Sequence, residues 1–239
     1  YRDALTGLPN WASLSMKLEE IFTANAGSCQ QGCLFFIDMD NLKEVNDTYG
    51  HTSGNDVIKA AAGNITAAVG EDAFIARLGG DEFSVLLCDV YDRKRIAEIA
   101  QRLLFMLNHD YIVGEKLVRL SASIGVALYP ENGEAAEELL KNADNAMYAA
   151  KTAGKNCWRF YTDQMQAAAQ EKMALISSLH HVLAKQELSI VYQPIVEIST
   201  KQIVSFEALL RWQSAEYGNV SPARFIPLLA MCRQRATMA

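Results

Sequence analysis

Four carboxylates, placed at two points of the sequence, are of the type that a divalent metal ion needs. Asp38 and Asp40 directly follow the apolar run 33–37, and another pair, Asp81 and Glu82, follows two glycines. Side chains alternate along a strand, so Asp38 and Asp40 are expected on one side of it. Grouped carboxylates are costly unless a cation neutralises them. We therefore expect Asp38 to share a magnesium (or manganese) site with a carboxylate from a neighbouring turn.

Polar residues elsewhere in the first 155 positions extend this chemistry toward a phosphorylated nucleotide. The side chains that could take part are Lys43, Asn46, Asp47, His51, Lys151 and Lys155. Gly79 and Gly80 have no Cβ, so the backbone there can approach a ligand closely. Each residue taken singly has an ordinary structural explanation, such as a turn cap for Asp38 or a solvated helix end for Lys151. Taken together, they favour a site for a metal ion and a nucleoside triphosphate.

The elements expected to position these residues alternate between helices and strands. Helices are predicted after the cap residue Asn10 and over 57–69, 92–108 and 134–152. Strands are predicted over 33–37, 74–77, 83–88, 116–127 and 157–161. The second and third strands are separated by a short glycine-bearing turn, which indicates a hairpin. This order predicts an α/β domain whose mixed central sheet is flanked by helices.

The remainder of the chain has a different pattern. A long connecting helix is predicted over 163–186, with an apolar stripe formed by Met173, Ile176, Leu179 and Leu183. A strand pair is predicted over 188–198 and 202–212. Some fifty residues are too few for an independent core of this kind. We therefore expect residues 187–239 to be the beginning of a second, incomplete domain.

Composition excludes several classes of protein. The chain has 239 residues, half of them hydrophobic, and a net charge of -6, which gives no basic surface for nucleic acid. It contains no GxxxxGK[ST] run, which excludes a P-loop, and no apolar run long enough to span a membrane. The five cysteines are odd in number and lack metal-ligand spacing, so reduced thiols and a cytoplasmic location are expected. A longer parent protein could still be attached to a membrane.

The run 78–83, LGGDEF, resembles the signature of the GGDEF domain of diguanylate cyclases. Two further runs support the resemblance: DALTGLPN at 3–10 and DMDNLKEVNDTYGH at 38–51. It covers about residues 1–162. The resemblance implies a palm-like nucleotidyl-cyclase fold and the condensation of two GTP molecules into cyclic-di-GMP with release of pyrophosphate. It also implies a homodimer, because each domain holds one GTP and a 3′-hydroxyl must reach the α-phosphate of the opposite nucleotide.

The resemblance assigns roles by position. Asp38 and Asp81 are the implied metal carboxylates, with the Met39 carbonyl as a backbone ligand. Glu82 is the implied carboxylate near the reacting hydroxyl. The implied substrate contacts are Lys43 and Lys151 to phosphates, Asn46 to guanine, and Gly79 and Gly80 close to the nucleotide. Asp3 could pair with Arg77, either to hold the N-terminal segment or as a plain surface ion pair.

Three positions depart from the family pattern. Asn55 stands where an Asp commonly accepts two guanine protons, and an amide has only one accepting atom, so base affinity should be weaker. Lys155 stands where an Arg commonly contacts phosphate, so the charge is kept but the bidentate fork is lost. The product-inhibition motif RxxD is replaced by residues 70–73, GEDA. Feedback inhibition through that motif is therefore not expected.

Two runs near the end, YQPIV at 192–196 and EALLRW at 207–212, resemble the first strands of an EAL domain, the family of cyclic-di-GMP phosphodiesterases. The later metal ligands of that family have no counterpart before Ala239, so this chain is not expected to hydrolyse cyclic-di-GMP. Two hypotheses follow. The chain is a working cyclase controlled by an upstream sensory domain, or a GTP-binding regulatory module that acts on an attached EAL domain through the helix 163–186.

Overall fold

The structure, a computed structural model, describes residues 1–23 and 31–236, with residues 230–236 described by their backbone alone. The chain divides into two compact units, Tyr1–Gln166 and Ala167–Ala239. All of the predicted site residues lie in the first unit.

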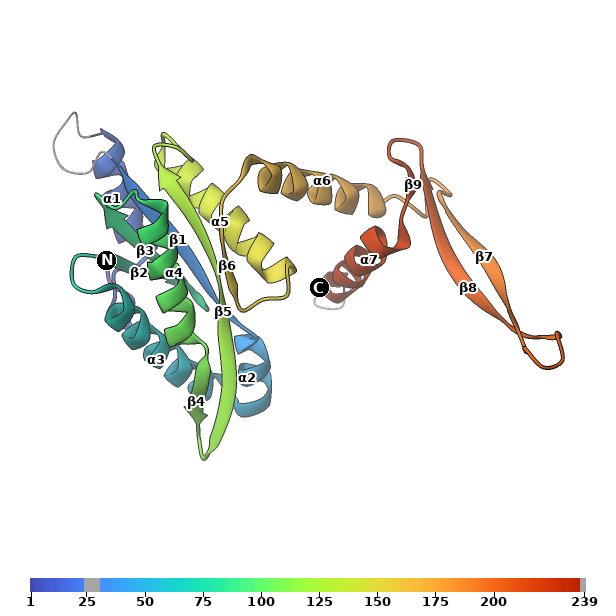
Figure 1. Cartoon of the computed structure of the whole chain (residues 1–239), viewed down its shortest axis with the longest axis horizontal. Helices are drawn as coiled ribbons and strands as arrows, with labels where there is room; N and C mark the ends of the chain where they lie inside the picture. The colour runs from blue at the N-terminus through green and yellow to red at the C-terminus, as the bar shows by residue number, and fades with distance from the viewer. Residues whose placement is uncertain (24–30, 237–239) are drawn as a thin grey trace. The chain divides into compact units, whose positions relative to one another are not determined.

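A six-stranded sheet forms the centre of the first unit (Figure 1). Its strands are β1 (Gly32–Asp40), β2 (Phe74–Gly79), β3 (Glu82–Cys88), β4 (His109–Val113), β5 (Lys116–Tyr129) and β6 (Cys157–Phe160). The helices are α1 (Trp11–Thr23), α2 (Leu42–Tyr49), α3 (His51–Val69), α4 (Arg93–Leu107) and α5 (Ala136–Thr152). The strand order is β2-β3-β1-β5-β4, and β6 pairs with β5. Only the β5–β6 pair is parallel among these strands, which confirms the predicted mixed α/β sheet.

Helices cover both faces of this sheet. α3 and α4 pack on one face together with Phe35 and Ile37 of β1, whereas α1 and α5 pack on the other face with Leu34 and Phe36. All of β1 is buried, as expected for a central strand with both faces covered. Because side chains alternate along a strand, Asp38 shares the face of Leu34 and Phe36. The strand therefore directs Asp38 toward the face that α5 covers.

Gly125 allows α5 to approach the sheet closely. A Cβ at this position of β5 would lie 2.0 Å from the Ala143 carbonyl oxygen and 2.1 Å from the Met147 nitrogen. No side chain could fit at that distance, so the α5 backbone rests directly on the β5 backbone. This contact sets the height at which Lys151, in the last turn of α5, stands above the sheet.

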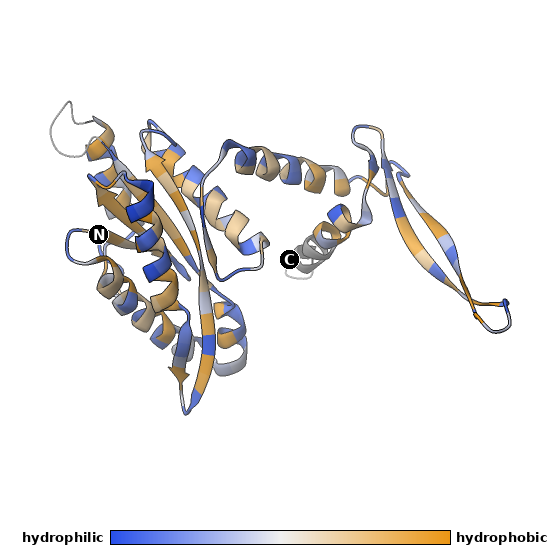
Figure 2. Ribbon diagram, viewed as in Figure 1, coloured by the Kyte–Doolittle hydropathy of each residue, from blue (hydrophilic) through white to orange (hydrophobic). Residues whose placement is uncertain are grey.

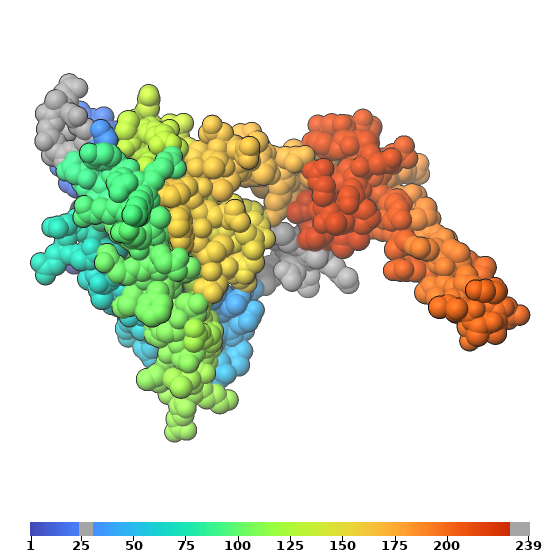
Figure 3. Space-filling model, viewed as in Figure 1, coloured from blue at the N-terminus to red at the C-terminus, as the bar shows by residue number. Residues whose placement is uncertain are grey.

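Most of the predicted elements are present, with differences at their ends. Asn10 caps α1, because its Oδ1 accepts a hydrogen bond from the Ser13 backbone nitrogen at 3.1 Å. β1 continues beyond the predicted end at residue 37, since residues 38–40 pair with residues 121–123 of β5. The prediction missed α2 and β4. β4 and β5 form a hairpin whose tip projects beyond the rest of the first unit (Figure 3).

The second unit is smaller than the first and has fewer helices and strands among the described residues. They are α6 (Asp163–Leu179), β7 (Leu188–Val196), β8 (Ile203–Ser214), β9 (Gly218–Val220) and α7 (Pro222–Ala236). The predicted strand pair is confirmed as the antiparallel hairpin β7–β8. The predicted helix 163–186 is too long, because α6 ends at Leu179. Its predicted stripe is wrong at Met173 and Leu183, which are 67% and 79% exposed.

The core of the second unit is correspondingly limited. Among the residues whose side chains the structure describes, seven buried ones form it: Leu175, Leu179, Val182, Trp212, Val220, Phe225 and Leu228. Most of the β7–β8 hairpin remains exposed, including large residues such as Tyr192 and Phe206. Figure 2 shows hydrophobic positions along this hairpin. A sheet that leaves its apolar side chains exposed has not built a full core.

The cysteines differ from the expectation that all are reduced. Cys33 and Cys157 are free thiols, but Cys88 is disulfide-bonded, so that expectation is wrong for Cys88. Spacing in the sequence could not show this, because a disulfide depends on which residues meet in space. Burial raises the pKa of the Cys33 thiol to about 12, which keeps it unreactive. Within the described parts of the chain, no helix has the length and apolar character to cross a bilayer.

Candidate active site

The end of β1 and the β2–β3 turn bring the predicted metal carboxylates together. Asp38 is the register partner of Glu82, and the Met39 backbone nitrogen donates a hydrogen bond to the Asp81 carbonyl oxygen at 3.1 Å. Gly79 and Gly80 have φ values of 151° and 52°, a conformation that glycine adopts without strain. The tight turn therefore holds Asp81 beside the last residues of β1, and the sequence prediction that the two segments meet is correct.

Lys151 completes this arrangement from α5. Its Nζ lies 2.6 Å from Asp38 Oδ2, and the side chains of Lys151 and Asp38 are 30% and 6% exposed. Burial raises the pKa of Asp38 to about 6; Lys151 lowers it, whereas the charges of Asp81 and Glu82 raise it. Three carboxylates, Asp38, Asp81 and Glu82, thus face one lysine. Ionised together they would give the site an excess of negative charge, which an added cation would neutralise.

Asp144 belongs to the same cluster and was not found from the sequence. The pKa of Glu82 is raised, first by burial and then by the charges of Asp144 and Asp81. Asp144 stands seven residues before Lys151 on α5, which places both on one side of that helix. This i, i+7 relationship is the signal that could have identified it.

Asp40 shares the sheet face of Asp38 but has a different environment. It is 1% exposed, and its carboxylate accepts hydrogen bonds from Ser121 Oγ at 2.7 Å, Ser123 Oγ at 2.7 Å and the Asn156 backbone nitrogen at 3.0 Å. These donors occupy both carboxylate oxygens. Asp40 is therefore a structural carboxylate, as opposed to a free ligand.

The other predicted lysines lie in separate places. Lys155 follows α5 and donates a hydrogen bond from its Nζ to Asn41 Oδ1, directly after β1. This contact keeps Lys155 next to the end of β1 and hence near the carboxylates. Lys43 lies on the exposed surface of α2. None of the contacts recorded for the described residues joins Lys43 to the carboxylate cluster, so its place at a substrate stays a prediction.

The residues predicted to bind a base lie on α2 and α3. Asn46 packs over Gly54, where an added Cβ would lie 1.9 Å from Asn46 Oδ1. The Asn46 side chain thus occupies the space beside Gly54 in the first turn of α3, and a larger residue at 54 would displace it. Asn55 is exposed on the neighbouring position of α3. Asn46 therefore lies against Gly54, the residue that precedes Asn55 in α3. The binding of guanine by Asn46 and Asn55 stays a prediction.

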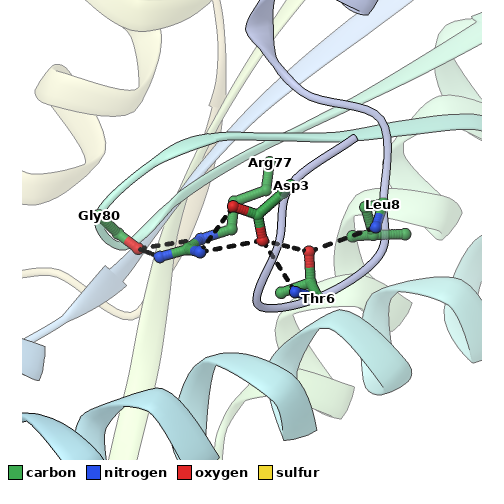
Figure 4. Close-up of polar contacts among 5 residues, drawn as sticks. All are labelled: Asp3, Thr6, Leu8, Arg77 and Gly80. Atoms are coloured by element: carbon green, nitrogen blue, oxygen red, sulfur yellow. Dashed lines mark hydrogen bonds and ion pairs between the residues drawn. The ribbon is translucent and has the colours of Figure 1, made fainter. Parts of the chain in front are cut away.

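Arg77 links the β2–β3 turn to the N-terminal segment (Figure 4). Its Nη1 donates to both carboxylate oxygens of Asp3 at 3.0 Å, and its Nη2 donates to the Gly80 carbonyl oxygen at 2.7 Å. The Asp3 carboxylate also accepts from the backbone nitrogen and the hydroxyl of Thr6. Both members of the ion pair are largely buried. Of the two readings left open by the sequence, the structure favours a tether over a plain surface pair.

The donor set fits a magnesium ion that a ligand helps to hold. Asp38 and Asp81 supply carboxylates, and the Met39 carbonyl faces the turn because the N–H and C=O of one strand residue point to the same side. Among the described residues, no three His, Cys, Asp or Glu side chains are grouped so as to hold a metal ion by themselves. Mg²⁺ commonly uses only one or two protein carboxylates and completes its shell with water and phosphate oxygens. The residues are therefore compatible with Mg²⁺ in the presence of a phosphate ligand.

A cavity of about 620 Å³ lies elsewhere in the first unit. It is lined by the end of β3 and by α4 residues that include Arg95 and Arg102, and it contains none of the predicted site residues. The substituted 70–73 run contributes Asp72 to its wall.

Comparison with known proteins decides the family. The family described as "Diguanylate cyclase, GGDEF domain" matches residues 1–157, and the EAL domain family matches residues 176–239. The chain belongs to the GGDEF family. The LGGDEF run of β2–β3 matches the name of this family, and the predicted metal carboxylates lie in that run and at the end of β1.

Three relatives illustrate the similarity. The bifunctional diguanylate cyclase/cyclic di-GMP phosphodiesterase MucR of Pseudomonas aeruginosa is 39% identical over 226 residues, which cover 95% of this chain and 33% of MucR. The GGDEF domain of PA1120 from the same species is 32% identical with a TM-score of 0.65, covering 71% of this chain and 99% of that one. DgcB of Caulobacter crescentus, solved as coiled coil and GGDEF domain with c-di-GMP, is 25% identical with a TM-score of 0.58, covering 67% and 84%.

This chain therefore joins a GGDEF domain to part of an EAL domain, as the sequence predicted. It spans about a third of the length of the curated relatives it matches.

Proposed function

We propose that the GGDEF domain of this chain is a working diguanylate cyclase, which condenses two GTP molecules into cyclic-di-GMP and pyrophosphate when two copies face each other. The observation that carries the proposal is the meeting of Asp38, Asp81 and Glu82 with Lys151 at one end of the sheet. A buried, negatively charged site with one lysine suits a metal ion and a phosphate group together.

Each residue has a defined task in this proposal. Asp38, Asp81 and the Met39 carbonyl hold Mg²⁺ or Mn²⁺, which supplies positive charge to the triphosphate and lowers the pKa of the attacking hydroxyl. Glu82, whose pKa is raised, stands next to Asp38 and accepts the proton of the 3′-hydroxyl. Lys151 neutralises phosphate charge.

The substrate is held at three further points. Gly79 and Gly80 let the turn backbone approach the nucleotide, and Asn46 and Asn55 bind the guanine. Lys155, and Lys43 from α2, bind phosphates. Because each domain holds one nucleotide, the 3′-hydroxyl of one GTP attacks the α-phosphate of the other only in a dimer.

A second function has its own support. The EAL family matches residues 176–239, and Asn55 replaces the Asp that is expected at the base. Both features favour a GTP-binding module that regulates an attached phosphodiesterase and has little turnover of its own. In the complete protein, an upstream sensory domain and the EAL domain would then be its partners.

One experiment separates the two functions. The chain, artificially dimerised, is incubated with GTP and Mg²⁺, and cyclic-di-GMP is measured. Product that is lost in Asp81→Ala supports the cyclase. GTP binding without product supports the regulatory module. If neither GTP nor Mg²⁺ raises the melting temperature, neither proposal holds.

A further inference from the structure

Asp40 is a buried carboxylate whose three hydrogen-bond donors come from two different segments. Ser121 and Ser123 belong to β5, whereas the Asn156 backbone nitrogen belongs to the loop between α5 and β6. Taking a charge out of water is costly, and three donors at 2.7–3.0 Å offset that cost. Asp40 therefore joins β1, β5 and this loop at one point.

The loop that Asp40 holds has an unfavourable backbone. Lys155 and Asn156 have φ values of 63° and 47°, in the left-handed region that side-chain-bearing residues rarely adopt. Such a conformation persists only where surrounding contacts fix it. The hydrogen bond from the Asn156 nitrogen to Asp40 is one such contact, and the parallel pairing of Cys157 with Ser123 begins immediately afterwards.

Two lysines flank this fixed loop. Lys151 stands in the last turn of α5 and pairs with Asp38, and Lys155 reaches Asn41. Asp38 and Asn41 lie on either side of Asp40 along the chain. The anchor at Asp40 thus sits between the two places where the lysines meet β1.

We propose that Asp40 is a positioning residue, which sets the places of Lys151 and Lys155 relative to the metal carboxylate Asp38. This inference rests on the proposed function, because it assumes that the two lysines bind phosphate. Asp40 itself touches neither metal nor nucleotide. Its buried carboxylate keeps the two phosphate-binding lysines at fixed positions relative to the metal ligand Asp38.

The test compares ligands that contain phosphate with one that does not. Affinities for GTP with Mg²⁺ and for guanosine are measured by calorimetry on the full chain and on Asp40→Ala. We expect GTP affinity to fall by about tenfold, whereas guanosine affinity stays within about twofold, because the hydrogen bonds of the Asp40 carboxylate go to β5 and to the loop after α5 and none goes to Asn46 or Asn55. Asp40→Asn keeps an acceptor for the Asn156 nitrogen and should therefore keep most of the GTP affinity of the wild type.

A matched control removes a buried hydrogen bond from α5, the helix that carries Lys151. Asn142 is 5% exposed on α5 and donates from Nδ2 to the Asn132 carbonyl oxygen at 3.0 Å. Asn142→Ala should destabilise the domain without changing the ratio of GTP to guanosine affinity. If Asp40→Ala does not fold, Asp40→Glu replaces it, because the longer side chain keeps the charge but displaces the loop. This variant should also lower the affinity for GTP more than the affinity for guanosine.

Four outcomes would overturn the inference. Equal losses of affinity for GTP and for guanosine would show that Asp40 acts only on stability. The same selective loss of GTP affinity in Asn142→Ala would show this as well. An unchanged GTP affinity in a folded Asp40 variant would show that the lysines do not depend on it. A wild-type chain that binds no GTP would overturn the proposed function together with this inference, and so differs from the other three results.

Discussion

Lys151 Nζ lies 2.6 Å from Asp38 Oδ2, so the carboxylate proposed to hold a metal ion is paired with the lysine proposed to hold a phosphate. The pair lies at the covered face of the sheet, where Asp38 has little access to water. A nucleotide bound with Mg²⁺ offers a new partner to each charge: the cation to Asp38 and a phosphate to Lys151. Binding of the metal and of the triphosphate is therefore expected to be coupled through this pair.

Lys151→Met should destabilise the metal-free protein. Removing one partner of a fully buried pair leaves the other charge without compensation and lowers the free energy of unfolding by about 3–5 kcal/mol. Lys151 is partly exposed, so we expect a loss of about 1–3 kcal/mol in the free energy of unfolding. Urea unfolding in the presence of a chelator measures it.

The control for this variant is Lys59→Met. Lys59 pairs with Asp56 at 3.4 Å, and both side chains are more than half exposed. Its loss should stay within about 0.5 kcal/mol, as for other exposed pairs. Equal losses in the two variants would contradict the assignment of Lys151 as the counter-ion of a buried carboxylate.

The raised pKa of Asp38 predicts a pH-dependent stability. The group binds a proton more tightly in the folded protein, with a pKa of about 6 against 3.8 for the ordinary group. Its contribution to stability is therefore fully present below about pH 4 and is lost as the pH rises through 6. At most about 3 kcal/mol is involved.

This contribution is isolated by comparing Asp38→Asn with the wild type. The free energy of unfolding of each is measured in metal-free buffer from pH 4 to pH 7. The stability of the wild type should fall relative to that of Asp38→Asn across the range, because an amide does not titrate. A difference that is constant with pH would show that Asp38 does not titrate there.

Much of the fold could be predicted because local patterns are strong in the central elements. The apolar run at β1 and the helical spacing in α3 each specify one element. α2 and β4 were missed because they are short and bury few residues: Leu42 and Val45 in α2, Tyr111 and Val113 in β4. Elements of that size are stabilised by tertiary packing, which a local pattern does not contain.

The site was predicted unevenly for a similar reason. Asp38 and Asp81 follow from a strand end and a hairpin turn, both of which are local features. The role of Asp40 depends on the register of β1 with β5, and that of Asp144 on the close approach of α5 at Gly125. Register is set by the whole domain, so no local pattern identifies the role of Asp40. The i, i+7 spacing places Asp144 on the side of α5 that carries Lys151, but only the packing of α5 on the sheet brings that side to the carboxylates.

Asp3→Ala should loosen the β2–β3 turn that carries Asp81. The Asp3 carboxylate accepts from Thr6 and from Arg77, and Arg77 in turn holds the Gly80 carbonyl. We expect a loss of about 2–4 kcal/mol in the free energy of unfolding, since a largely buried arginine loses its partner. Product formation by the dimerised chain should fall as well, and both are measured on the same preparation.

Asp110→Ala is the matched control for Asp3→Ala. Asp110 pairs with Arg119 at 3.7 Å on the exposed β4–β5 hairpin, with side chains 48% and 65% exposed. Its loss should stay within about 0.5 kcal/mol and leave turnover unchanged. Full activity in a folded Asp3→Ala chain would show that the tether serves stability alone.

Asn55→Asp should raise the affinity for GTP and the preference for GTP over ATP. A carboxylate can accept the protons on N1 and N2 of guanine with two oxygens, whereas the amide has one accepting atom. Hydrogen bonds to a charged group contribute about 1.5–3 kcal/mol, so we expect the GTP dissociation constant to fall about tenfold or more. Adenine lacks these two donors, so ATP binding should not improve.

Asp56→Asn, one position away on the exposed surface of α3, changes charge without reaching the base and should leave both affinities unchanged. A parallel gain for ATP in Asn55→Asp would mean that position 55 acts through its charge alone, and that guanine is recognised elsewhere.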